Sequence, residues 1–375
     1  MVKGLFESFF LGGFECSTHR LKSGRRLDEI DATGHDRFAV DDYLRLQSQG
    51  MRTARDGLRW HLIEKTPREY DFSSLLPMVE AARTTKTQVI WDLCHYGWPD
   101  WLDIFKPQFI DSFRRLAKEF GRLWKQETDE VLFVCPINEI SFFSWAAGQV
   151  GIFNPFRKRR GNELKRQLVR AAIAAIEELW SIDRRTRIAQ IDPLINVVPA
   201  DVNNRQHKRA AEGYRMSQFA AWDMLAGRIE PELGGAEKYL DIVGGNYYVH
   251  NQWVLHGSFI TPDDPRYRPF REMLSELYQR YNRPIFIAET GIEDELRPSW
   301  FRYVCEEALA AIKAGVPVEG ICLYPIVNHP GWDDDRHCYN GLWDYPDESG
   351  HREIYQPLAD ELQRQRKIFS SIGKE

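Results

Sequence analysis

The chain has 375 residues, of which 43% are hydrophobic and 13% aromatic, with 12 tryptophans and a formal net charge of −5. This length fits two ordinary domains or one large barrel, and the apolar content is ample for a core. The mildly acidic balance argues against a general nucleic-acid-binding protein, and no apolar run reaches the roughly 18 residues of a membrane span. The many aromatic residues suit a core, or a cleft in which sugars stack on rings.

The amino-terminal stretch MVKGLFESFFLGGFEC has a short apolar core that Glu7 interrupts, so we interpret it as the first strand rather than a signal peptide. Six cysteines are scattered along the chain without a CxxC pair: Cys16, Cys94, Cys135, Cys305, Cys322 and Cys338. Several lie in apolar runs, which indicates reduced, buried thiols in a cytoplasmic protein rather than a disulfide framework or a zinc knuckle.

Short apolar runs alternate with longer segments of helical period, which is typical of a parallel α/β fold. The predicted strands cover residues 8–14, 53–58, 88–93, 131–137, 187–191, 240–246, 284–288 and 320–324. Between them, residues 109–124, 169–180 and 300–314 carry apolar side chains at helical spacing. Eight strand–helix units without a break in composition predict a single (β/α)8 TIM barrel, one domain over residues 1–375, rather than two domains.

In such a barrel the active site lies at the carboxyl ends of the strands. Two apolar runs end there in a glutamate: FVCPINEI at Glu139, next to Asn138, and PIFIAET at Glu289. A buried carboxylate needs a partner or a cavity, and two facing carboxyl groups are the minimum equipment for cleaving a glycosidic bond. The other polar or aromatic residues expected at strand ends are Arg55, His95, Asn246, Tyr247, Tyr248 and Trp332. The pattern predicts a glycosidase.

The surroundings of the two glutamates predict different pKa values. Arg55 ends the second strand and is the obvious cation to keep Glu289 ionised, and a hydroxyl from Tyr247 or Tyr248 could donate to the same carboxylate. Glu139 has no adjacent cation in the sequence and is followed by apolar residues. Burial and the negative charge of Glu289 would therefore keep Glu139 protonated, as a general acid must be.

These motifs resemble the family 1 glycoside hydrolases of the β-glucosidase type, within the clan of retaining (β/α)8 glycosidases, as a divergent and shortened member. The segments that carry the resemblance are FLGGFECSTH, ARDGLRW, WDLCHYGWPDWL, PINEI, LDIVGGNYY, FIAETG and YPIVNHPGW. The resemblance implies Glu139 as acid/base, Glu289 as nucleophile, a β-glycoside or oligosaccharide substrate, and no metal or organic cofactor. It also implies that the following residues bind the substrate: His19, Arg55, His95, Asn138, Asn246, Tyr248 and Trp332.

The sequence departs from the family pattern at sugar-binding positions. His19 stands where the family has a first-strand glutamine, and Gly331 where it has the glutamate that grips the distal hydroxyls. The tryptophan that opens the same motif is Tyr324. The acidic run at residues 333–335 either replaces the lost glutamate or is a solvated loop. The catalytic pair is therefore better supported than specificity for glucose.

Three other functions remain open. A transglycosidase would use the same carboxylate pair with an acceptor other than water. A glycan-binding barrel without catalysis would not need the nucleophile or its supporting residues. A metal-dependent hydrolase would draw on His19, His95, His329, His337 and the acidic run, but no metal ligands stand at short spacing.

The basic run at residues 157–160 follows the fourth strand and is either a solvated face or an attractor of anionic glycans. The sugar, the linkage, the aglycone and the oligomeric state are not determined by the sequence.

Overall fold

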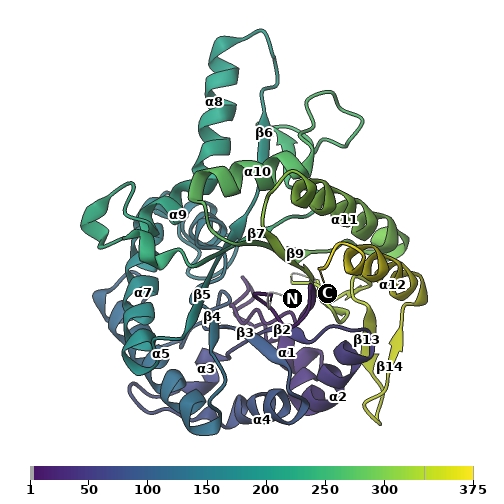
Figure 1. Cartoon of the computed structure of the whole chain (residues 1–375). Coiled ribbons are helices and arrows are strands. Elements are labelled where there is room, and N and C mark those ends of the chain that lie inside the picture. The colour runs from purple at the N-terminus through teal and green to yellow at the C-terminus, as the bar shows by residue number, and fades with distance from the viewer. Residues whose placement is uncertain (1–3, 333, 375) are drawn as a thin grey trace.

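The computed structural model describes residues 4–332 and 334–374, and its centre is a ring of strands enclosed by helices (Figure 1). Eight parallel strands close a barrel in the order β1-β10-β9-β7-β5-β4-β3-β2. They are β1 (Phe10–Gly13), β2 (Thr53–Gly57), β3 (Gln88–Asp92), β4 (Phe133–Cys135), β5 (Arg187–Pro193), β7 (Ile242–Asn246), β9 (Ile285–Thr290) and β10 (Val318–Leu323). Each predicted strand overlaps one of these eight. The predicted (β/α)8 barrel is confirmed.

The fourth strand is shorter than predicted, because β4 pairs with its neighbours only as far as Cys135. The chain beyond it stays tied to both neighbouring strands. The Asn138 N–H donates to the Cys94 carbonyl (3.0 Å), and the Glu139 N–H donates to the Ile191 carbonyl (3.0 Å). These bonds hold the two residues at the rim of the barrel, where the sequence predicts them.

The long outer helices form where apolar residues recur every three or four positions. In α5 (Pro107–Glu127), Phe109, Phe113 and Phe120 are fully buried on one face, and Pro107 begins the helix where its missing N–H costs nothing. This helix packs against α7 (Gly161–Ile182). Together with α11 (Arg297–Lys313), α5 and α7 confirm the three helical stretches that the sequence predicts.

The remaining helices complete the ring or lie in connections. They are α1 (Glu29–Ala32), α2 (His35–Ser48), α3 (Trp60–Ile63), α4 (Leu76–Thr85), α6 (Ile140–Phe143), α8 (Arg205–Met216), α9 (Ala220–Leu225), α10 (Phe270–Tyr281) and α12 (Gln356–Ser370). A π-helical turn, η2 (Ser144–Val150), follows α6. It belongs to the connection between β4 and α7, which forms part of the site described below.

Three two-stranded sheets lie outside the barrel: β6 (Asn196–Val198) with β8 (Gln252–Val254), β11 (His329–Pro330) with β12 (His337–Cys338), and β13 (Trp343–Pro346) with β14 (Arg352–Ile354). The first of these pairs follows the carboxyl ends of β5 and β7. Near it, α8 projects away from the ring of helices (Figure 1). We call residues 194–269, without β7, the rim extension.

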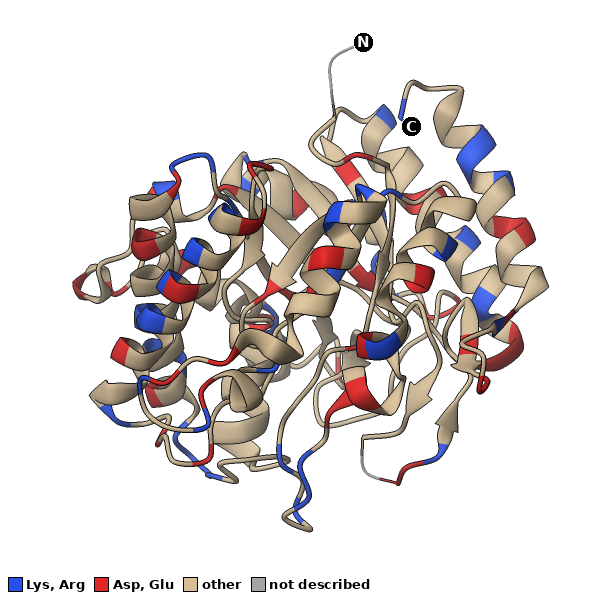
Figure 2. Cartoon of the chain, turned by 90° about the horizontal axis from the view of Figure 1, so that it is seen from below, with Lys and Arg blue, Asp and Glu red and all other residues tan. Residues whose placement is uncertain are grey.

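Side chains inside the barrel form a compact core that includes Leu11, Ile90, Phe133 and Phe286. All six cysteines are buried and free. Figure 2 shows acidic and basic residues interspersed along the helices rather than gathered by sign. Among the helices that the structure describes, none has the length and apolar composition needed to cross a bilayer.

Candidate active site

A cavity of about 900 Å³ lies at the carboxyl ends of the barrel strands. Both predicted catalytic glutamates, Glu139 and Glu289, line it, together with His95, Tyr248 and Trp332. These residues come from segments far apart in the chain, and closure of the barrel brings them to one place. The sequence-derived expectation that Glu139 and Glu289 share a pocket therefore agrees with the geometry.

Glu289 lies at the end of β9, and both of its oxygens accept hydrogen bonds. Arg55 Nη1 donates to Oε1 (2.7 Å), and the Tyr248 hydroxyl donates to Oε2 (2.8 Å). Arg55 is fully buried, and on its other side Nη2 donates to Asp92 Oδ2 (2.7 Å). Burial alone would lower the pKa of Arg55, but Asp92 and Glu289 hold it well above its usual value. The guanidinium is thus a permanent cation beside Glu289.

Asn138 connects this cation to the third strand. Its Oδ1 accepts from Arg55 Nη2 (2.7 Å), and its Nδ2 lies 3.0 Å from both His95 Nε2 and the Tyr96 hydroxyl. On the far side of the ring, His95 Nδ1 lies 2.9 Å from Asp92 Oδ2. The amide and the imidazole are therefore fixed by one buried network, in which Asp92 and Tyr96 are members that the sequence analysis missed.

Glu139 has surroundings of the opposite kind. Within the part of the chain that the structure describes, no cationic side chain forms an ion pair with it. Its carboxyl group accepts from Asn246 Nδ2 (2.8 Å) and from the Tyr96 hydroxyl. Burial, followed by the charge of Glu289, raises the pKa of Glu139 to about 8. Glu139 is therefore protonated at neutral pH, as the sequence predicts.

The backbone at Glu139 and at Tyr96 adopts a left-handed conformation, with φ of 47° and 64°. In residues other than glycine, such a backbone conformation costs roughly 1–3 kcal/mol, so the surrounding structure must hold it in place. At Glu139 the anchoring N–H bond to the Ile191 carbonyl does so. Strained residues of this kind cluster at functional sites.

His19 does not line the cavity, in contrast to its predicted role in the sugar site. Its ring packs against Trp332 and Phe153, with ring centroids 4.7 and 4.6 Å apart, and burial lowers its pKa to about 3. Glu15 lines the wall instead, with Oε1 3.8 Å from His95 Nε2. Next to His19, the Thr18 N–H bonds to the His95 carbonyl (3.2 Å), which ties this segment to the residues after β3. Glu15 directly follows the predicted first strand, and this position at a strand end could have indicated that it belongs to the site.

Of the two tyrosines that could reach Glu289, only Tyr248 does so. The Tyr247 ring stacks on Phe270 at 3.9 Å, and its hydroxyl lies 2.7 Å from that of Tyr267. Successive residues of an extended strand point to opposite sides, so one tyrosine enters the core when the other faces the cavity.

A second cavity, of about 390 Å³, shares Glu15, Tyr248 and Trp332 with the first. Gly331 and Asp334 also line it, and the Asp334 carboxylate lies so close to Gly331 that a Cβ at that position would clash with it. Asp334 therefore occupies the space that a larger residue at 331 would take. Asp333, the first residue of the acidic run, lies outside the described residues.

The structure groups potential metal ligands differently from the set that the sequence suggested. In residues 4–332 and 334–374, the group that meets metal-ligand spacing is Cys16, Asp92 and His95. His95 Nδ1 lies within hydrogen-bond distance of both partners, at 2.9 and 3.2 Å. Burial raises the pKa of the Cys16 thiol well above its usual value, which disfavours the thiolate that binds metals. His19, His329 and His337 are not part of this group.

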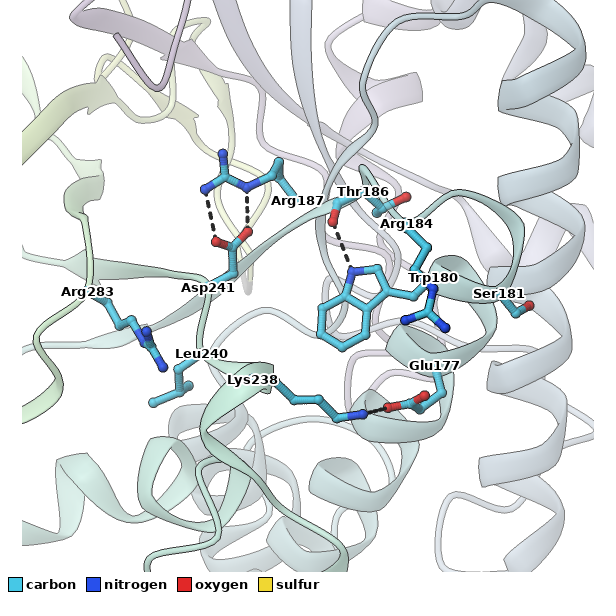
Figure 3. Close-up of a pocket in the computed structure, with 10 residues that line it drawn as sticks. All are labelled: Glu177, Trp180, Ser181, Arg184, Thr186, Arg187, Lys238, Leu240, Asp241 and Arg283. Carbon is cyan, nitrogen blue, oxygen red and sulfur yellow. Dashed lines mark hydrogen bonds and ion pairs between the residues drawn. The ribbon is translucent and has the colours of Figure 1, made fainter.

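The opposite end of the barrel carries a surface cavity of about 500 Å³, at the amino ends of β5 and β7 (Figure 3). Four of its charged residues form two pairs: Arg187 with Asp241, at 2.6 and 2.9 Å, and Lys238 with Glu177. None of the predicted site residues lies there.

No protein-family model matches the chain, and no curated protein matches it by sequence. Solved structures match by fold. A β-glucosidase from Thermotoga maritima in complex with glucoimidazole is 16% identical, with a TM-score of 0.77 and full coverage of both chains. A family 1 β-glucosidase from Thermotoga maritima is 17% identical, also with a TM-score of 0.77 and full coverage of both.

The AHE enzyme from Alicyclobacillus herbarius is 16% identical, with a TM-score of 0.77, 96% of this chain covered and 98% of that one. The resemblance to the family is thus confirmed at the level of the fold. Over its whole length, the chain has the fold of the family 1 β-glucosidases.

Proposed function

We propose that this protein is a retaining β-glycosidase, with Glu139 as acid/base and Glu289 as nucleophile. One observation carries the proposal: two carboxyl groups line one cavity in opposite environments. Glu289 is held beside the Arg55 cation, whereas Glu139 pairs with no cation in the described part of the chain and has a pKa raised to about 8. One carboxyl group beside a cation and one that keeps its proton suit one nucleophile and one acid.

In the first step, Glu139 gives its proton to the glycosidic oxygen while the Glu289 carboxylate attacks the anomeric carbon. The bond to the leaving alcohol breaks, and a glycosyl ester of Glu289 forms. In the second step, Glu139, now a carboxylate, takes a proton from water, whose oxygen attacks the same carbon and releases Glu289. The net reaction adds one water to the glycoside with retained configuration, and it needs no metal or organic cofactor.

The contacts around the cavity support a carbohydrate substrate. We assign sugar hydroxyl contacts to His95 and to Glu15, which takes the place predicted for His19, and ring stacking to Trp332. Asp334, beside Gly331, is positioned to substitute for the missing distal glutamate. The Thermotoga maritima β-glucosidase in complex with glucoimidazole supports a sugar-binding cavity in this fold. The buried free cysteines fit the predicted cytoplasmic location, which stays a prediction.

The experiment is covalent trapping with a panel of 2-deoxy-2-fluoro aryl β-glycosides, followed by peptide mass spectrometry. The expected result is one glycosyl adduct on the peptide that contains Glu289. The Glu289→Ala variant should lose turnover of aryl β-glycosides, and azide should restore it with an inverted product, as resolved by NMR of the anomers. Full activity of Glu289→Ala would overturn the assignment.

The same experiment separates the alternatives. Trapping without hydrolysis, but with turnover when an acceptor alcohol is added, would identify a transglycosidase. The absence of both trapping and turnover across glucosides, galactosides, mannosides, xylosides and fucosides would favour a glycan-binding barrel.

A further inference from the structure

Two chemically different segments build the outer part of the candidate active-site cavity. The rim extension contributes aromatic rings: Tyr214, Trp253 and Phe259 line the cavity, and Tyr214 and Trp253 meet edge to face at 5.9 Å. The connection between β4 and α7, together with the start of α7, contributes polar groups, among them Gln149 and Lys165. A ligand in this region would meet both apolar rings and hydrogen-bond donors.

Lys165 is the unusual member of this wall. Among the described residues it forms no hydrogen bond and no ion pair, although its side chain is half-buried. Burial lowers its pKa, and the charges of Asp192 and Glu230 oppose this effect from a distance. Glu230 is itself paired with Arg166. A partly buried ammonium without a partner in the protein is stabilised by an anion supplied from outside.

The basic run at residues 157–160 lies beside the same wall. The N–H groups of Arg157 and Arg159 bond to the carbonyls of Ala147 and Gln149, at 2.9 and 3.0 Å. The side chains of residues 157–159 are exposed, whereas Arg160 pairs with Glu163. Exposed cations beside a cavity raise the local concentration of anions.

The position of this wall relative to Glu139 indicates which part of a substrate it touches. Glu139, Ser144 and Gln149 lie in the β4–α7 connection and Lys165 near the start of α7, and all four line the same cavity. Under the proposed function, Glu139 protonates the oxygen of the leaving group. His95 and Trp332, assigned to the sugar, come from other segments. The wall that begins at Glu139 is therefore assigned to the leaving group.

We propose that Lys165, with the side-chain amides of Gln149 and Asn162, binds an anionic substituent on the leaving group, and that the preferred substrates are β-glycosides of aromatic acids. The ammonium and the two amide NH2 groups can each donate to a carboxylate oxygen. Tyr214, Trp253 and Phe259 provide rings for an aromatic aglycone. This inference rests on the proposed function for the identity of the leaving group.

The test compares kcat/KM for 3- and 4-carboxyphenyl β-glycosides with that for the matching carbamoylphenyl β-glycosides, which are neutral and of similar size. The meta and para isomers sample two distances from the glycosidic oxygen. At least one acid should be preferred by about tenfold or more over its amide, the size expected of hydrogen bonds to a charged group. In Lys165→Met this ratio should fall to near one, and in Lys165→Arg it should largely return.

The matched control is Lys158→Met, which removes the same charge from the exposed run beside the mouth and should keep the ratio. Equal losses in Lys158→Met and Lys165→Met would overturn the site, because only the long-range field would then matter. A wild-type enzyme that turns over both substrates of each pair equally would also overturn it.

Calorimetry with free 3- and 4-hydroxybenzoate, and with the corresponding hydroxybenzamides, separates this inference from the proposed function. Binding of an acid that Lys165→Met loses, in a protein that turns over no glycoside, would support the anion site and overturn the enzymatic function. Turnover of neutral glycosides without any preference for the acids would support the enzymatic function and overturn the anion site.

Discussion

Ion pairs between arginine and carboxylates occur at both ends of the barrel, but they differ in their exposure to solvent. At the carboxyl end, the Arg55 side chain is 0% exposed and lies between Asp92 and Glu289. At the amino end, Arg187 pairs with Asp241, and their side chains are 34% and 27% exposed (Figure 3). Water can replace a partner at the amino end but not at the carboxyl end. Burial, rather than the presence of charges, therefore distinguishes the candidate site.

The largest effect is expected for Glu139→Gln. The substitution keeps the size of the side chain but removes the transferable proton, so kcat for a β-glycoside with a poor leaving group should fall by about 10²–10⁴-fold. The control is Glu177→Gln, which neutralises a carboxylate at the amino end and should leave kcat unchanged. Steady-state kinetics measure both. A Glu139→Gln enzyme as active as the wild type would show that Glu139 is not the acid.

Arg55→Met should have the next largest effect, on stability. It leaves Asp92 and Glu289 buried without their cation, and such a loss costs about 3–5 kcal/mol of unfolding free energy. Arg187→Met removes the matched cation at the amino end and should cost about 1 kcal/mol or less, because Asp241 remains hydrated. Urea unfolding at neutral pH measures both free energies. Equal losses at the two ends would contradict the contrast drawn from burial.

The pH dependence follows from the pKa of Glu139, which burial raises to about 8. The acid role requires the protonated form, which predominates below this value and is lost as the pH rises through it. kcat/KM should therefore be maintained through neutral pH and decline above about pH 8. A profile that already declines near pH 5, where an ordinary glutamate has ionised, would contradict this assignment.

Tyr96→Phe should have the smallest effect, a displacement of that profile. The Tyr96 hydroxyl donates to Glu139 and lowers its pKa, because the hydrogen bond favours the carboxylate. Removing it should move the decline to higher pH. Tyr239→Phe removes a comparable bond to Glu177 (2.7 Å) at the amino end and should move nothing. A shift of the decline to lower pH in Tyr96→Phe would contradict the conclusion that the Tyr96 hydroxyl lowers the pKa of Glu139.

Much of the fold could be predicted because its signals are local. Alternating apolar runs and helical periods identified all eight barrel strands, and the rule that sites lie at strand ends led to Glu139 and Glu289. Asp92 escaped notice because it closes an apolar strand, and its function is visible only through Arg55, which comes from another strand. Its place next to the end of the predicted strand at residues 88–93 was a weak signal.

The side-chain directions could not be predicted from spacing alone. Glu15 and His19 are four residues apart, and Glu15 lines the cavity whereas His19 packs against Trp332 and Phe153. Likewise, Tyr96 reaches Glu139 through a left-handed backbone that no local propensity favours. Both depend on contacts between distant segments, which a single sequence does not display.

The guanidinium of Arg55, on β2, bonds to groups from three other segments: Asp92 on β3, Asn138 after β4 and Glu289 on β9. The last of them, β9, begins at residue 285. During synthesis, more than half of the chain is therefore added between Arg55 and Glu289, the last of its partners. Premature termination before β9 would leave Arg55 paired with Asp92 but without Glu289, in a barrel that cannot close, so truncated products should be degraded rather than accumulate as half-barrels.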